Sequence, residues 1–306
     1  MPNWCANRIE ISVSAERKAE VLAWVNGELY PYYQRAINQS IRLFLAGVIG
    51  RLKPATDVIY KPYPALTAHG CGEASPETDA FTQWLGLLQS NAQLDEQCCD
   101  LINRYYIDSG ISGLKRDDLS ASEQAKIDEI IKAKSHDWMS FVNGSCEQKA
   151  FFDRLDSDVL PNETFSLLYI LPTRLACEIN GYNGRLLDGI SSTYHQYTAD
   201  YGTKWPSNCD VSLDIHGNTI VIDVDTAWTP PCENVIEAMS ERWQAVILHY
   251  YSEAGCDFCG YRQYIEGSLM DLIDGCLEYE DCEDDDCYAE VIGPDWLVDN
   301  ITHYGG

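Results

Sequence analysis

The amino-acid sequence predicts an α+β fold, in which a mainly helical middle region is followed by an antiparallel sheet. Between about residues 31 and 138, apolar side chains recur every three or four residues, which is the period of an amphipathic helix. From residue 164 onward the period changes to two, which is typical of half-buried strands. Apolar residues make up 45% of the chain and aromatic residues 11%, so the chain can bury a substantial core.

The first 30 residues are predicted to form one strand and one helix. In Asn3–Val13, apolar and polar side chains alternate, which favours a strand. Ser14 can cap the helix that we expect over Ala15–Asn26, and Gly27 can end it.

Residues 31–163 are predicted to be mainly helical. We expect three helical stretches, which are Tyr32–Leu52, Glu77–Tyr106 and a helix from Ser120 to about Ser135. Ser120 and Glu123 have the spacing of a capping box. Lys53–Pro76 is rich in proline and glycine and is predicted to be an irregular connection.

Residues 164–270 are predicted to form one α+β domain. The expected strands are Phe165–Leu171, Cys209–Leu213, Thr219–Asp225, Ala245–Tyr251 and Phe258–Glu266, with a helix over Glu233–Arg242. The sequence His216-Gly217-Asn218 is a hairpin signal between two of these strands. This order suits an antiparallel sheet with helices packed on one face. A short helix is expected to begin at Ser268, and residues 271–306 are predicted to be an acidic C-terminal arm.

Charge is the strongest signal in the composition. The chain has 48 acidic and 21 basic residues and a net charge of −27. Residues 208–306 hold 22 of the acids and only two bases, Arg242 and Arg262. Such a field repels nucleic acid and anionic lipid, and it attracts basic protein surfaces. We therefore expect no direct binding to nucleic acid and no binding to membranes. The expected partner is a protein or protein complex with a basic surface.

The most acidic stretch lies near the C-terminus, where aromatic and apolar residues are interleaved with the acids. A tail that only improves solubility needs no aromatic residues, so the interleaving favours an arm that docks on a partner. A solvated tail is the alternative, whereas a calcium loop would need the spacing and glycine of an EF-hand. The predicted partner-binding residues are Glu278, Glu280, Asp281, Glu283, Asp284, Asp285, Asp286, Glu290 and Trp296.

Signals for export, disulfides and metal binding are weak. No apolar stretch approaches the roughly 18 residues that a membrane span needs, and the first residues do not resemble a secretory signal. We therefore expect a cytoplasmic protein whose 13 cysteines are mostly free thiols. Cys256 and Cys259 have the CxxC spacing of zinc and redox sites, but no second such pair follows. We assign no metal ligand and no cofactor.

Catalytic motifs are also missing from the sequence. The six histidines form no recognisable ligand pair or nucleophile motif, and there is no phosphate-binding glycine loop. Asp223 and Asp225 share one strand face and are interpreted as the solvated side of an amphipathic strand. We therefore expect a protein that is not an enzyme and has no catalytic residues.

Four clusters of residues carry a resemblance to a known family. They are Met1–Ile9, Tyr201–Trp205, Asp225–Pro231 and Tyr250–Gly260. Together they resemble the Api-type family of phage and plasmid accessory proteins, a domain-of-unknown-function group with a C-terminal ferredoxin-like domain. The resemblance implies a ferredoxin-like sheet and an origin in a mobile element, and it supplies no catalytic residues. It does not extend to the helical middle or the acidic tail.

These clusters also contain an alternative site. Their tryptophans and glycines are explained by strand ends and tight turns. A ligand pocket formed by Lys204, Trp205, Trp228 and Glu253 is the second interpretation.

The leading functional hypothesis is a non-enzymatic inhibitor from a phage or plasmid. It would block a host defence complex by covering a basic surface with its acidic face, a mode that includes nucleic-acid mimicry. The alternatives are a small-ligand or metal-binding enzyme with a pocket near Trp205 and Trp228, and a phage structural or assembly protein. The sequence leaves homo-oligomer formation open.

Overall fold

The structure is a computed structural model that describes residues 3–138, 148–280 and 290–306. The chain divides into two compact units. The sheet unit comprises Met1–Tyr30, Asn162–Leu171 and Tyr197–Gly306, and the helical unit comprises Pro31–Pro161 and Pro172–Gln196. The helical unit is therefore inserted into the sheet unit, which is built from three separate segments of the chain.

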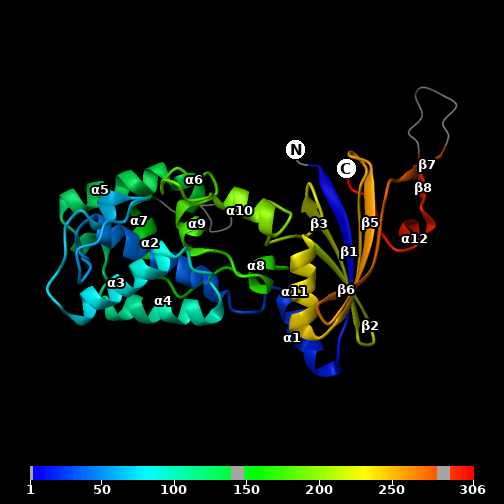
Figure 1. Ribbon diagram of the computed structural model, residues 1–306, viewed down its shortest axis with the longest axis horizontal. Coiled ribbons are helices and arrows are strands. Elements are labelled where there is room, and N and C mark those ends of the chain that lie inside the picture. The colour runs from blue at the N-terminus through cyan, green and yellow to red at the C-terminus, as the bar shows by residue number, and fades with distance from the viewer. Residues whose placement is uncertain (1–2, 139–147, 281–289) are drawn as a thin grey trace. The chain divides into compact units, whose positions relative to one another are not determined.

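The sheet unit contains a six-stranded antiparallel sheet (Figure 1). In sheet order, its strands are β2 (Val211–His216), β3 (Thr219–Ala227), β1 (Trp4–Ser12), β4 (Val246–Glu253), β5 (Phe258–Ile265) and β6 (Ser268–Gly275). Its helices are α1 (Ala15–Val25), α8 (Leu167–Ile170) and α11 (Glu233–Trp243). The expected hairpin is confirmed, because β2 and β3 are joined by Gly217 and Asn218.

One face of this sheet carries the main core of the unit. The alternation in β1 buries Ile9 and Ile11 completely on this face. Helices α1 and α11 cover it (Figure 1), and Trp24 and Trp243 meet there with ring centroids 5.0 Å apart. Aromatic pairs at this separation add about 1 kcal/mol beyond the area that they bury.

Two expected elements of this unit are wrong. Phe165–Leu171 was expected to be a strand, but it contains the short helix α8, because a short apolar run is compatible with either buried element. Ser268 was expected to begin a short helix, but it begins β6. Leu269, Leu272 and Ile273 have helical spacing, and pairing of this segment with β5 overrides that local preference.

The segment after β6 packs onto the other face of the sheet. It contains β7 (Glu278–Tyr279), β8 (Val291–Gly293) and α12 (Asp295–Val298). A small core joins it to the sheet, and this core contains Ala6, Cys259, Leu277, Leu297 and Ile301. The described part of the C-terminal arm is therefore docked on its own sheet (Figure 1).

The helical unit confirms the prediction of a mainly helical middle region. Its helices are α2 (Tyr32–Val48), η1 (Pro64–Thr67), α3 (Pro76–Gln89), α4 (Glu96–Asp108), η2 (Arg116–Asp118), α5 (Ala121–Ala133), α6 (Ser135–Trp138), α7 (Gln148–Arg154) and α9 (Leu175–Asn180), and α10 (Thr193–Asp200) crosses the boundary between the units. The capping box is present, since Glu123 N donates to Ser120 Oγ and Ser120 N donates to Glu123 Oε2.

One expected helix of this unit is two helices. The stretch Glu77–Tyr106 is interrupted between α3 and α4, where Asn91 has a φ of 47°. Leu94 N donates to Thr173 O at 2.8 Å in the same interval, and this bond lies outside any helix. Along the described residues, no helix has both the length and the apolar character needed to cross a membrane.

Candidate functional site: an acidic sheet face and its rim

The candidate site is the face of the sheet opposite α1 and α11. Because paired residues of neighbouring strands point to the same side, the register assigns side chains to this face without ambiguity. The arm covers one end of it and leaves the rest accessible. We call this accessible part the open face, and it comprises Glu10, Asp214, Asp223, Leu248, Tyr250, Tyr261, Gln263, Asp271 and Ile273.

The open face is strongly acidic. The one cation that the register of the described strands places on this side of the sheet is Arg8 of β1, and the Asp223 carboxylate engages it through two bonds of 2.8 Å. This ion pair raises the pKa of Arg8 above its ordinary value. Among the described residues, no lysine, arginine or histidine is ion-paired with Glu10, Asp214 or Asp271. Three uncompensated carboxylates therefore remain on the face.

Two tyrosines lie on the open face, and one of them, Tyr250, borders the small core under the arm. Tyr250 of β4 and Tyr261 of β5 are paired across the strands, and their ring centroids are 4.9 Å apart. Partial burial raises the pKa of both hydroxyls, and the negative charge of Glu10 adds to this effect. The tyrosines therefore stay protonated at neutral pH and can donate hydrogen bonds. Tyrosines surrounded by charged residues have the composition of the centre of a protein interface.

The predicted partner-binding acids lie at the covered end of this face. Glu278 and Glu280 follow β6, Glu290 precedes β8, and all three are exposed. Glu280 N donates to Glu290 O at 2.9 Å. Asp281, Glu283, Asp284, Asp285 and Asp286 lie outside the described residues. Trp296, which was also predicted to bind a partner, packs against the small core under the arm.

Three of the four predicted pocket residues come together. The Lys204 ammonium lies 4.2 Å from the ring centroids of both Trp205 and Trp228, so it is held between the two indoles. Trp4 packs against Trp205 with centroids 5.8 Å apart, and Trp228 N donates to Asn3 O. The three indoles are between 36% and 44% exposed. Lys204 thus occupies the position that a ligand would take between these rings.

Glu253, the fourth pocket residue, has a structural position. Its side chain is completely buried and accepts hydrogen bonds from the backbone N–H groups of Gly255 (2.8 Å) and Cys256 (2.6 Å). Burial alone would raise the pKa of Glu253, but the bonds from Cys256 and Gly255 outweigh it and hold the pKa below the ordinary value. The carboxylate therefore orders the turn between β4 and β5.

The cysteine pair in the same turn has the wrong chemistry for a redox site. Cys256 is exposed, and its hydrogen bond with Glu253 raises the pKa of the thiol. Cys259 is buried, and burial raises its pKa to about 11. Both thiols are therefore protonated at neutral pH, whereas the thiolate is the reactive form. In the part of the chain that the structure describes, no three histidine, cysteine, aspartate or glutamate side chains are grouped to hold a metal ion.

Two polar residues of the sheet unit have structural explanations. Asp225 lies 3.0 Å from His303 Nε2, and burial raises the pKa of its carboxyl group. His249 is buried beneath the helices, with Nε2 3.1 Å from Asn7 Oδ1. Burial, with a smaller contribution from Arg262, lowers the pKa of His249 to about 3. His249 is therefore neutral at physiological pH and belongs to the core.

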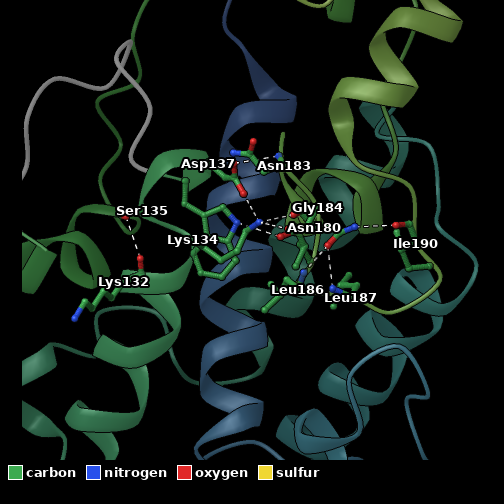
Figure 2. Close-up of polar contacts among 12 residues, drawn as sticks. Lys132, Lys134, Ser135, Asp137, Asn180, Asn183, Gly184, Leu186, Leu187 and Ile190 are labelled. Carbon is green, nitrogen blue, oxygen red and sulfur yellow. Dashed lines mark hydrogen bonds and ion pairs between the residues drawn. The ribbon is translucent and has the colours of Figure 1, made fainter.

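The helical unit contains a buried lysine that could be mistaken for a catalytic group. Figure 2 shows Lys134, which is 4% exposed, directed at Asp137 and at two backbone carbonyls. Lys134 Nζ donates to Asn180 O (2.7 Å), to Gly184 O (2.8 Å) and to the Asp137 carboxylate. An ammonium has three donors, and all three are used. Lys134 therefore fixes the loop after α9.

Sequence reasoning missed the residues that define the open face. The carboxylates are Glu10, Asp214 and Asp271, and the aromatic residues are Tyr250 and Tyr261. The alternation in β1 already placed Glu10 on a solvated side, and Tyr250 and Tyr261 lay in expected strands. What the sequence lacked was the register, because these residues are up to 261 positions apart and only strand pairing brings them together.

Family comparisons place the chain among proteins without an assigned activity. Residues 30–205 match the family described as protein of unknown function DUF1281. Residues 191–292 match the ferredoxin-like domain in Api92-like protein. The crystal structure of a protein api92 from Yersinia pseudotuberculosis superimposes with a TM-score of 0.84 and 32% identity, over 92% of this chain and 100% of that chain. The expected ferredoxin-like fold and the resemblance to Api-type proteins are therefore confirmed. The expectation that this resemblance stops short of the helical middle is wrong, because residues 30–205 match the family as well.

Two Escherichia coli (strain K12) proteins are similar in sequence. The uncharacterized protein YubB is 45% identical over 143 residues, which are 46% of this chain and 99% of YubB. The uncharacterized protein YubA is 36% identical over 177 residues, which are 58% of this chain and 100% of YubA. Each of these relatives is thus matched along essentially its whole length by about half of this chain.

Proposed function

This chain belongs to the DUF1281 family of proteins of unknown function, and we propose a function for it from its structure. We propose that it is a protein-binding module whose open face docks onto a basic surface of a partner protein. The observation that carries the proposal is the make-up of that face. It combines a tyrosine pair with three carboxylates, those of Glu10, Asp214 and Asp271, that form no ion pair with a cation of the described residues. Aromatic side chains supply contact area at low entropic cost, and the carboxylates select a cationic counterpart.

The charge of the whole unit supports the same proposal. By sequence, the sheet unit contains 28 acidic and 6 basic residues, a net charge of −22. A field of this size accelerates encounters with a basic protein and opposes encounters with nucleic acid or anionic lipid. The described part of the arm packs on the same side of the sheet as the open face.

In the cell, the proposed protein would act by occlusion, that is, by covering a surface of its partner. A partner surface that normally binds nucleic acid is basic, and the open face could cover it without any catalytic step. We therefore propose a non-enzymatic inhibitor or adaptor, with a host protein or host defence complex as its target. An origin in a phage or plasmid and mimicry of nucleic acid belong to this proposal and rest on the resemblance and on the charge.

The rival proposal of a small-ligand enzyme near Trp205 and Trp228 has less support. Lys204 already lies between the two indoles, and the Glu253 carboxylate is engaged by backbone N–H groups. The tryptophan cluster is better explained as a rim that adds exposed aromatic surface at one end of the sheet.

The proposal is tested by neutralising the open face at constant shape. The full chain and a variant carrying Glu10→Gln, Asp214→Asn and Asp271→Asn are used as baits in affinity purification with mass spectrometry. A matched control carries Asp57→Asn, Glu73→Gln and Asp108→Asn, three exposed acids of the helical unit. We expect the face variant to lose the basic partner by at least about tenfold, while the control retains it. Binding should also weaken steeply between about 50 and 500 mM salt.

A face variant that captures the same partner as strongly as the unaltered chain would show that the open face is not the docking surface. Circular dichroism of both variants ensures that a loss of capture does not reflect unfolding.

A further inference from the structure

The last strand of the sheet, β6, has an outer edge that no other strand of the described residues covers. It pairs with β5 alone and stands at the end of the strand order. Seven of its eight residues are exposed. Met270, Leu272 and Ile273 are among them, with 59%, 49% and 38% of their surfaces accessible. An edge strand with exposed apolar side chains is a template for pairing with another strand.

The usual protection of such an edge is partly missing from β6. It contains no lysine and no proline, and its one irregularity is a register shift at Met270, near its start. What it does contain is two carboxylates, Asp271 and Asp274. Arg262 binds Asp274 at 2.6 Å, and Tyr251 donates to the same carboxylate at 3.0 Å. Asp274 is therefore already engaged by its own domain.

Asp271 is engaged in a different way. Its carboxylate accepts a hydrogen bond from the backbone N–H of Leu272 at 2.9 Å. An added strand would present a backbone carbonyl to the same Leu272 N–H. It would therefore displace the Asp271 carboxylate, which occupies this N–H in the free protein. Once it is replaced, Asp271 becomes an unpaired anion beside the new strand, where a lysine or arginine could pair with it.

The charge decides what kind of strand can be added. A second copy of this chain would bring a second sheet unit of net charge −22 and a second Asp271 to the same edge. Like charges at this distance oppose pairing. A strand that alternates apolar and basic residues has one apolar side and one basic side, so it would cover Leu272 with the first and pair with Asp271, on the open face, with the second.

We propose that β6 binds an extended segment of a partner protein, with alternating apolar and basic residues, as a seventh strand of the sheet. This inference rests on the proposed function, since it names the part of a basic partner that the sheet unit recognises. The open face and the β6 edge are continuous, because Asp271 and Ile273 belong to both.

The test uses the full chain and a fluorescent peptide of eight residues, the length of β6, with valine and lysine alternating. Fluorescence anisotropy at about 100 mM salt measures its affinity, since screening there weakens purely long-range attraction. A second peptide has the same sequence but carries N-methyl groups on alternate backbone nitrogens. It keeps the charge and cannot pair along its length. We expect the N-methylated peptide to bind at least about tenfold more weakly.

Two substitutions in β6 locate the binding site. Leu272→Pro removes the N–H that Asp271 occupies, and Leu272→Lys keeps the N–H but places a cation on the edge. Each should weaken peptide binding by about tenfold or more. Ile215→Lys is the matched control, because Ile215 is 45% exposed on β2 at the opposite edge. It should change the affinity less than about twofold.

Three results would overturn the inference. The first is failure of the unmethylated peptide to bind the unaltered chain, and the second is equal binding of both peptides. The third is a dimer of the chain in light scattering that Leu272→Lys converts to monomer, since a second copy would then be the occupant.

If both Leu272 variants bind the peptide normally while neutralising the open face still abolishes partner capture, the proposed function stands without the edge. If neutralising the open face leaves capture unchanged while the Leu272 variants lose the peptide, the edge stands without the proposed docking face.

Discussion

The two units of this chain treat charge in opposite ways. The helical unit holds 20 acidic and 15 basic residues and carries a net charge of −5, against −22 for the sheet unit. In the helical unit, two cations are buried inside the structure. Arg42 is completely buried, and its guanidinium donates to Leu114 O at 2.6 Å and lies 3.7 Å from the Asp156 carboxylate. Lys134 donates all of its ammonium hydrogen bonds to Asp137 and to two backbone carbonyls. In the sheet unit, the carboxylates of Glu10, Asp214 and Asp271 remain accessible, whereas Glu253 is buried.

Buried charged side chains therefore serve the fold, whereas exposed charged side chains without a counterion are available to a partner. A buried ion that is bonded within its own unit contributes to a unique structure and is inaccessible to another molecule. An exposed carboxylate without a counterion adds little to stability and retains its attraction for a cation. Removing a buried cation should therefore destabilise the fold, and removing open-face acids should affect binding.

The largest effect is expected at Arg42. Replacing it with Met leaves three backbone carbonyls without this donor and removes the cation that lies 3.7 Å from the Asp156 carboxylate, so we expect a loss of about 3–5 kcal/mol in the free energy of unfolding of the helical unit. Denaturant unfolding followed by circular dichroism measures it. Arg35→Met is the control, because Arg35 pairs with Asp158 at the surface and should cost under about 1 kcal/mol. Equal effects of the two changes would contradict the division into structural and available charge.

A smaller effect is expected at His249, the buried histidine of the sheet unit. Its pKa is about 3 in the folded protein, below the ordinary value of 6.5, so only the unfolded chain takes up the proton between these values. The stabilisation is complete above pH 6.5 and is lost as the pH falls towards 3. Between pH 6.5 and 5 the loss should be about 2 kcal/mol.

The measurement for His249 is the stability at pH 6.5 and at pH 5. His249→Gln should remove most of the difference between the two, whereas His216→Gln, a change at an exposed residue of β2, should preserve it. A histidine that titrated normally in the folded protein would give the same pH dependence with and without the substitution.

The smallest effect is expected at Lys204. Replacing it with Met keeps an apolar chain between Trp205 and Trp228 and removes the cation, so the loss should be at most about 1 kcal/mol. Tryptophan fluorescence reports the change locally. A loss of several kcal/mol would show that this cluster is a structural centre like that of Arg42.

The sequence predicted the elements whose signals lie within a few residues, and it missed β6, whose strand form depends on pairing with a neighbour. Ser120 and Glu123 formed the expected capping box, and the hairpin at Gly217 and Asn218 was found because both signals lie within a few residues. Ser268–Gly275 was missed because its apolar spacing is helical and its strand form exists only beside β5.

The candidate site was predictable to the same limited degree. Charge counts identified the acidic third, and Lys204, Trp205 and Trp228 were correctly grouped. The open face was not found, because alternation shows that Glu10 is solvated and not which side chains from distant segments adjoin it. Trp296 was interpreted as a docking residue, but an aromatic side chain among acids can equally anchor an arm to its own sheet, as it does here.

The place of β1 in the sheet has a consequence for biosynthesis. This strand is made long before β3 and β4, yet it lies between them in the sheet, and Arg8 meets Asp223 across 215 positions of sequence. A ribosome must therefore translate most of the message before the sheet can close, while residues 31–196 have time to fold. Late closure of such long-range pairs is slow, so we expect newly made chains to keep Ile9 and Ile11 exposed for longest and to depend on chaperones at that stage.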